Sequence, residues 1–188
     1  LSDDGAVIPL NNASQLALTT DCLISGIHFL KTDPPDLIAW KALAVNVSDL
    51  AAMGAGPKSF LLSIAWPQDI KEEWISLFAH GLDLAQTEFG TSLIGGDTVS
   101  THGPMTISIA AVGEVFNNNI LKRNGASVGD DLYVTGTIGD AYLGLQVVRQ
   151  NIEVLNDKDR GYLKRRYQKP DPKHNIGLAL SDVASAAI

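Results

Sequence analysis

Short apolar segments separated by polar residues open the chain and predict β-strands. Apolar runs at 6–10 and 15–20 flank the polar residues 11–14, a pattern typical of a hairpin, and the second strand carries Thr20 and Asp21 at its end. Further apolar or alternating segments predict strands at 59–66, 92–94 and 105–115.

Two longer segments repeat apolar residues at spacings of three and four, the period of an amphipathic helix. The first follows the proline pair at 34–35 and should end at Gly54. The second, 71–88, has Asp69 as a candidate N-cap and Gly90 as its stop signal. Strands and helices in this order predict an α+β domain with a mixed sheet and helices packed on one face.

The three asparagines at 117–119 are the best candidate for a domain boundary. We therefore expect an N-terminal domain at 1–116 and the start of a C-terminal α/β domain at 117–188, which we expect to be incomplete. In this second domain the pattern predicts a strand at 132–136 and helices at 140–150, at 157–166 and from about 175 onward.

Composition narrows the classes of partner. The 188 residues hold 14 basic against 21 acidic side chains, a formal net charge of −7, and hydrophobic residues make up 45%. Nucleic-acid-binding proteins normally carry a concentrated positive surface, so a nucleic-acid partner is not expected. No apolar run approaches the roughly 18 residues of a membrane helix, so no membrane partner is expected either. The single cysteine, Cys22, predicts a reducing compartment, which favours a cytoplasmic location.

Aspartates stand at the expected strand ends and turns, with no lysine or arginine beside them. The segments Asp3-Asp4, Thr20-Asp21, Ser48-Asp49 and Gly96-Asp97 share this feature. Any one of these aspartates could merely cap a helix or begin a turn. Together, however, converging carboxylates would repel one another by roughly 4 kcal/mol per close pair unless a cation lay among them. Oxygen ligands without histidine or cysteine favour Mg²⁺, which usually brings phosphates with it.

Several common phosphate and nucleophile motifs are absent. The chain has no Gly-Lys-Ser/Thr ending of a P-loop, no G-x-G-x-x-G at the start of a helix, and no Gly-x-Ser-x-Gly. Two glycines at 95–96 would still let the backbone approach a phosphate closely, and Arg123 could hold a polyphosphate.

Taken in order, these segments resemble the thiamine-monophosphate kinase family, part of a superfamily that includes aminoimidazole ribonucleotide synthetase. The resemblance rests on the run 46–55 (Asn-Val-Ser-Asp-Leu-Ala-Ala-Met-Gly-Ala), on Thr20-Asp21 followed by His28-Phe29, on Gly95-Gly96-Asp97-Thr98, and on Arg123-Asn124-Gly125-Ala126 with Gly129-Asp130.

The resemblance implies ATP-dependent phosphorylation of thiamine monophosphate to thiamine diphosphate, in a homodimer joined through its sheets. By matching position, each group of residues receives a role. The implied Mg²⁺ ligands are Asp4, Thr20, Asp21, Asp49 and Asp97. The implied ATP contacts are Gly96, Asp97 and Arg123, and His28 would contact the thiamine phosphate. No general base is expected, because a phosphate acceptor is already mostly ionised at neutral pH.

Two features depart from the family pattern. Ser2 stands where the family usually has glycine, and the family's later Asp-x-Ser-Asp-Gly and Gly-Gly-Glu-Asp motifs do not occur in these residues. Two alternatives stay open: another ATP-using member of the superfamily, similar to aminoimidazole ribonucleotide synthetase, or a catalytically inactive metal-binding or dimerisation module.

Overall fold

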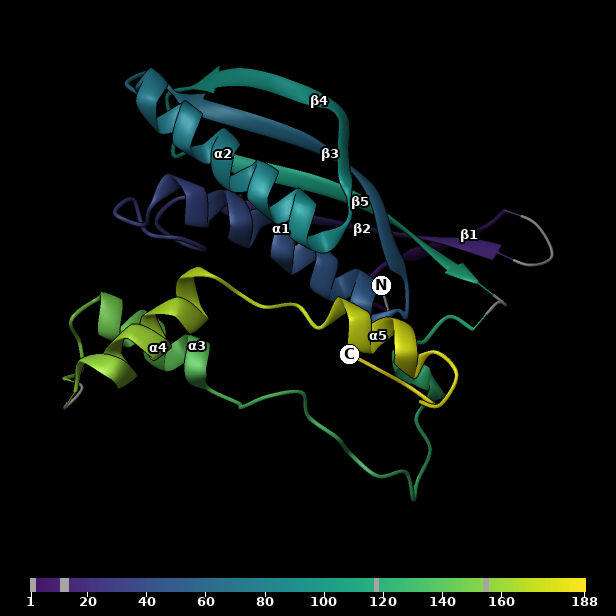
Figure 1. Ribbon diagram of the computed structural model, residues 1–188. Helices are drawn as coiled ribbons and strands as arrows, with labels where there is room; N and C mark the ends of the chain where they lie inside the picture. The colour runs from purple at the N-terminus through teal and green to yellow at the C-terminus, as the bar shows by residue number, and fades with distance from the viewer. Residues whose placement is uncertain (1–2, 11–13, 117–118, 154–155) are drawn as a thin grey trace.

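The computed structural model describes residues 3–10, 14–116, 119–153 and 156–188. A five-stranded mixed sheet forms one layer, and two long helices cover one of its faces (Figure 1). The strands are β1 (Ala6–Pro9), β2 (Ser14–Ile24), β3 (Gly56–Pro67), β4 (Ser92–Thr101) and β5 (Thr106–Phe116). The helices are α1 (Pro35–Ala52), α2 (Glu72–Phe89), α3 (Asp140–Val148), α4 (Asp157–Gln168) and α5 (His174–Leu180), with a short 3-10 helix at Arg123–Gly125.

The strand order is β1-β2-β5-β3-β4, and only the β3–β4 pair is parallel. Its crossover is α2, so the α+β architecture with helices on one face of a mixed sheet is confirmed. Both helix stops are also confirmed, because Gly54 and Gly90 follow α1 and α2 with the positive φ that favours glycine. Asp69 is not the N-cap of α2; Lys71 occupies that position without a side-chain cap.

The hydrophobic core lies between α1 and the sheet. Fully buried side chains of α1, among them Ile38, Leu43 and Leu50, pack with Phe60 of β3 and Ile109 of β5. Helix α1 is therefore apolar nearly all round, since α2 covers its other side. Within the described residues, no helix is both long and apolar enough to cross a membrane.

The expected turn at 95–97 is wrong: these residues lie inside β4, which continues to Thr101. The reason for glycine here is close packing between strands. A Cβ at Gly96 would overlap the backbone carbonyl of Leu62 in β3. The chain thus passes through the glycine pair as extended strand, and Asp97 becomes an edge-strand residue.

The expected strand at 132–136 is also wrong, because no strand among the described residues pairs with it. Its apolar side chains are largely exposed, with Leu132 at 93% and Tyr133 at 86%. A strand needs a hydrogen-bonded neighbour, and β-propensity alone does not supply one. The three helices α3 to α5 do form, although α5 ends at Leu180 rather than continuing.

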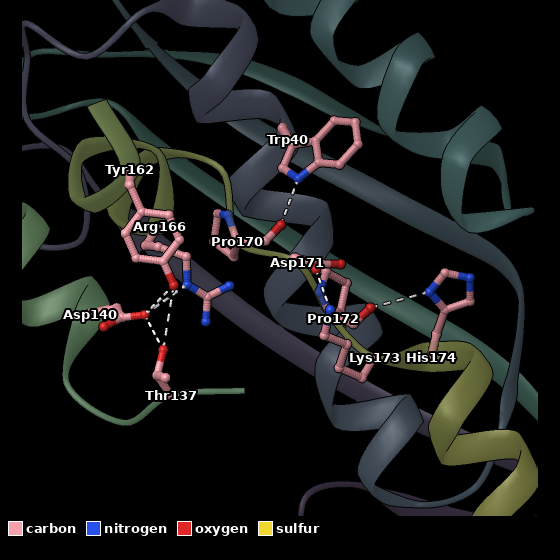
Figure 2. A network of polar contacts seen from close by, with 10 residues as sticks. All are labelled: Trp40, Thr137, Asp140, Tyr162, Arg166, Pro170, Asp171, Pro172, Lys173 and His174. Carbon is pink, nitrogen blue, oxygen red and sulfur yellow. Dashed lines mark hydrogen bonds and ion pairs between the residues drawn. The ribbon is translucent and has the colours of Figure 1, made fainter. Parts of the chain in front are cut away.

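The C-terminal helices are held by polar contacts that Figure 2 shows. Asp140 at the start of α3 accepts a hydrogen bond of 2.7 Å from the Tyr162 hydroxyl of α4 and one from Thr137, and these bonds hold its pKa below the usual range. The segment 169–173, which follows α4, is attached to α1, because the Trp40 indole N–H donates to the Pro170 carbonyl at 2.8 Å.

A buried polar cluster lies where α4 meets α1. Asp33, which is 4% exposed, accepts hydrogen bonds from the Gln168 amide at 2.7 Å and the Tyr167 hydroxyl at 3.3 Å. The Lys41 ammonium sits 3.5 Å from the centre of the Tyr167 ring. Burial lowers the pKa of Lys41 to about 8, and attraction to Asp33 offsets only part of that effect.

Lys41→Met is expected to change how stability depends on pH. Between about pH 8 and pH 10.4 the unfolded lysine still holds a proton that the folded one has lost, so wild-type stability rises relative to the variant. We expect the difference in unfolding free energy to grow by roughly 2 kcal/mol across this range, measured by urea unfolding at both ends. Lys71→Met, at an exposed position, is the control. A difference that stays constant with pH would contradict the prediction.

Candidate functional site

Three of the predicted aspartates lie near one another where the C-terminal half of α1 packs on β2. Asp49 is on α1, and Asp4 lies just before β1. Asp21 is paired in the sheet with the buried Ile109, so it belongs to the face that the helices cover. Asp49 interacts electrostatically with both Asp21 and Asp4. The structure therefore gathers an acidic cluster, defined here as Asp4, Asp21 and Asp49.

Thr19 holds this cluster together. Its hydroxyl donates to the Asp49 carboxylate at 2.7 Å and lies 3.2 Å from the backbone carbonyl of Asp4. One buried side chain thus touches two of the three segments that supply the aspartates. The sequence analysis did not single out Thr19, although strand alternation could have found it, because Thr19 and Asp21 are two residues apart and share a face.

The surroundings of Asp49 disfavour the ionised form of its carboxyl group. Burial raises the pKa of its carboxyl group above the usual range, and the charges of Asp21 and Asp4 raise it further. The hydrogen bond from Thr19 and the charge of Arg123 act in the opposite direction. The site thus holds more negative charge than its own groups compensate.

Arg123 is the cation that faces the cluster. Its guanidinium pairs with Asp4 through two nitrogens, with Nε 3.1 Å from Oδ2 and a second, closer contact from NH2 to Oδ1. Its backbone N–H also donates to the Asp3 carboxylate at 3.1 Å. The pKa of Arg123 is raised above its usual value, chiefly by the hydrogen bond to Asp4. A guanidinium fork is therefore bound where the sequence predicts metal ligands.

Thr20 lies on the opposite face of β2 from this cluster. It is exposed, and its hydroxyl donates to the Ile109 carbonyl at 3.0 Å. The structure therefore brings the neighbouring Thr19, not Thr20, into contact with Asp49.

Asp97 and Gly96 lie farther away. In the sheet register Asp97 pairs with Ser63, which continues through Ser108 to Cys22, so Asp97 is on the uncovered face. Three strand spacings separate β4 from β2, about 14 Å. Within one copy of the chain, Asp97 and Asp21 therefore cannot bind the same ion.

His28 occupies an exposed loop after β2. Its Nδ1 accepts a hydrogen bond of 2.9 Å from the backbone N–H of Ile24. This contact orients the ring and leaves Nε2 as the group that can face a ligand.

The donors in the cluster suit a hard divalent cation by their chemistry, since all are carboxylate or hydroxyl oxygens. In the part of the chain that the structure describes, however, no three histidine, cysteine or acidic side chains stand close enough together to hold one ion. Arg123 occupies Asp4 instead. The residues of the cluster are of the type that binds Mg²⁺ and lie near one another. In this structure, however, Asp4 pairs with the guanidinium of Arg123.

Comparison with known proteins shows which proteins this chain is similar to. Thiamine-monophosphate kinase of Salmonella typhimurium is 42% identical over all 188 residues, and that of Bacillus subtilis is 32% identical over 190 aligned positions. The chain spans 57% and 58% of the lengths of these two relatives.

Solved structures of this kind match the fold closely. A structure described as AaThiL complexed with AMPPCP and TMP superposes with a TM-score of 0.91 at 31% identity, covering 99% of this chain and 59% of that one. Thiamine-monophosphate kinase from Stenotrophomonas maltophilia gives a TM-score of 0.84 at 38% identity, covering 95% of this chain and 56% of that one. The family model described as AIR synthase related protein, N-terminal domain, matches residues 2–115. The chain therefore belongs to the AIR synthase related protein family.

Proposed function

We propose that this chain is the ATP- and metal-binding part of a kinase that phosphorylates thiamine monophosphate to thiamine diphosphate. The observation that carries the proposal is the acidic cluster with Thr19 and Arg123 at its edge, in a chain that aligns along its whole length with such kinases. The relative described with AMPPCP and TMP supports the choice of an ATP-like and a thiamine-phosphate ligand. A cytoplasmic location stays a prediction from cysteine usage.

The residues account for the main difficulty of this reaction, which is charge. Two polyanions must meet, and the acceptor phosphate is already mostly ionised, so the protein needs no general base. Arg123 offers a planar fork that can bind phosphate oxygens through two hydrogen bonds. Asp4, Asp21 and Asp49, with the Thr19 hydroxyl, would hold Mg²⁺, which when bound would neutralise phosphate charge and stabilise the transition state. His28 would position the thiamine phosphate.

The proposed reaction is an in-line transfer of the γ-phosphoryl group. An oxygen of the thiamine monophosphate phosphate forms the new P–O bond while the bond to the β-phosphate oxygen breaks, and ADP leaves. Both substrates must lie over the acidic cluster for this geometry. The half-buried position of Asp49 beside Thr19 supplies a fixed anchor at that place.

Dimerisation through the sheet is part of the proposal. The face of the sheet that α1 and α2 leave uncovered carries large apolar side chains that are about half exposed, namely Ile8, Leu61 and Val99. β4 is an edge strand that pairs only with β3 among the described strands, and its Leu93 and Ile94 are also exposed. Apolar faces and open edges of this kind favour association with a second copy. Asp97 lies on this face, so we propose that it serves the site of the partner subunit.

Kinase activity of the whole protein is the direct test. With ATP, Mg²⁺ and thiamine monophosphate we expect thiamine diphosphate, detected by chromatography. Asp49→Asn should lower kcat/KM by about 100-fold or more, because it removes a charge that holds the metal. Glu88→Gln, an exposed carboxylate on α2, should leave activity unchanged. Absence of thiamine diphosphate in the wild type would refute the proposed substrate.

Mixing two inactive variants tests the role of Asp97. If Asp97 acts across the dimer, Asp49→Asn and Asp97→Asn subunits form mixed dimers with one intact site, and activity should return to about a quarter of wild type. The control is each variant alone at the same total concentration. No recovery after subunit exchange would mean that Asp97 acts within its own subunit or not at all.

Thr19 and Thr20 provide a matched pair of neighbours. Thr19→Val removes the hydroxyl that donates to the half-buried Asp49, so we expect a loss of about 1.5 kcal/mol in the free energy of unfolding and weaker metal binding. Thr20→Val, at an exposed position, should cost less than about 0.5 kcal/mol. Urea unfolding and calorimetric titration with Mg²⁺ measure the two effects. Equal effects of the two substitutions would contradict the assignment of Thr19.

A further inference from the structure

The backbone on either side of Arg123 is packed against the rest of the protein, whereas its side chain is partly exposed. Two residues earlier, the buried Leu121 donates its N–H to the Met53 carbonyl at the end of α1, at 3.2 Å. Two residues later, Gly125 packs so closely on the backbone of Ser185 that a Cβ there would overlap its carbonyl. The backbone of the 3-10 helix is thus fixed beside the acidic cluster, whereas the Arg123 side chain remains 45% exposed.

The guanidinium of Arg123 compensates a well-enclosed carboxylate. The Asp4 side chain is only 10% exposed, and both of its oxygens face Arg123 nitrogens. Such a two-point contact takes one acceptor position on each oxygen and places a positive charge beside the carboxylate that a metal ion would also approach. The guanidinium and a metal ion at Asp4 would repel each other, so the two cations compete for this carboxylate.

We infer that Arg123 is an exchangeable counter-ion: it holds Asp4 while the site lacks metal, and metal binding displaces it toward the nucleotide phosphates. This inference rests on the proposed function for the identity of the metal and the nucleotide. The fixed backbone keeps the released guanidinium at the site, and the exposed side chain gives it room to turn. Binding of the metal and binding of the nucleotide are then coupled, because both favour the position in which the Arg123 side chain is turned away from Asp4.

The inference makes a prediction that distinguishes it from a merely structural ion pair. In the nucleotide-free chain, Arg123→Gln should bind Mn²⁺ about fivefold more tightly than wild type, since the competing guanidinium is gone. A structural pair that only fastens residues 3–5 would make metal binding weaker or leave it unchanged when broken. Mn²⁺ is the probe because its electron paramagnetic resonance spectrum reports the free ion directly.

Lys122→Gln is the matched control, because it removes one positive charge from the neighbouring exposed residue and changes the net charge equally. We expect the Mn²⁺ affinity of Lys122→Gln to stay within about twofold of wild type, because salt screens the charge of an exposed side chain. Arg123→Lys keeps the charge without the fork, so its affinity should fall between wild type and Arg123→Gln. All titrations are run at one ionic strength.

Thermal unfolding gives a second readout. In EDTA the Arg123→Gln chain should have a lower Tm than the Lys122→Gln chain, because its acidic cluster is uncompensated, and saturating Mg²⁺ should close the gap.

Equal Mn²⁺ affinity for Arg123→Gln and Lys122→Gln, or weaker binding by Arg123→Gln, would overturn the exchange while leaving a metal role for the cluster. Failure of every variant and of the wild type to bind Mn²⁺ would overturn the exchange and the metal site together. Binding of AMPPCP in saturating Mg²⁺, expected to weaken in Arg123→Gln, tests the nucleotide role separately.

Discussion

Repulsion among Asp4, Asp21 and Asp49 is the constraint on which the site depends. The fold brings these carboxylates together because β2 carries Asp21, α1 packs on it with Asp49, and the segment before β1 brings Asp4. Two contacts make this tolerable: the Thr19 hydroxyl on Asp49 and the Arg123 guanidinium on Asp4. Burial is the main cause of the raised pKa of Asp49, and repulsion from Asp21 and Asp4 adds to it.

The rest of the structure supplies rigidity around this cluster. The core between α1 and the sheet fixes the positions of Thr19 and Asp49, and Leu121 fastens the Arg123 segment to the end of α1. At the other end of α1, the contacts of Asp33 with Gln168 and of Trp40 with Pro170 hold the C-terminal helices in place. Helix α1 therefore lies between the acidic cluster and the C-terminal segment.

Much of the N-terminal fold follows from local pattern, and the failures have physical causes. The periodicity predicts α1 and α2, since each buries apolar side chains in the core, and the apolar runs around a polar segment predict the paired strands β1 and β2. The segment 132–136 has strand composition but no pairing partner among the described residues, which local sequence cannot reveal. For the site, the aspartates were predictable as a set of hard donors. That Asp97 lies on the opposite face from Asp21 depends on strand order and register, which no single segment encodes.

A crystal structure of the chain with Mn²⁺ bound would be the most direct measurement. Anomalous scattering should place the ion between Asp4, Asp21 and Asp49, with Thr19 beside it and the Arg123 guanidinium turned away from Asp4. Manganese bound elsewhere, or bound while Arg123 still grips both oxygens of Asp4, would contradict the view that one cation replaces another in this site.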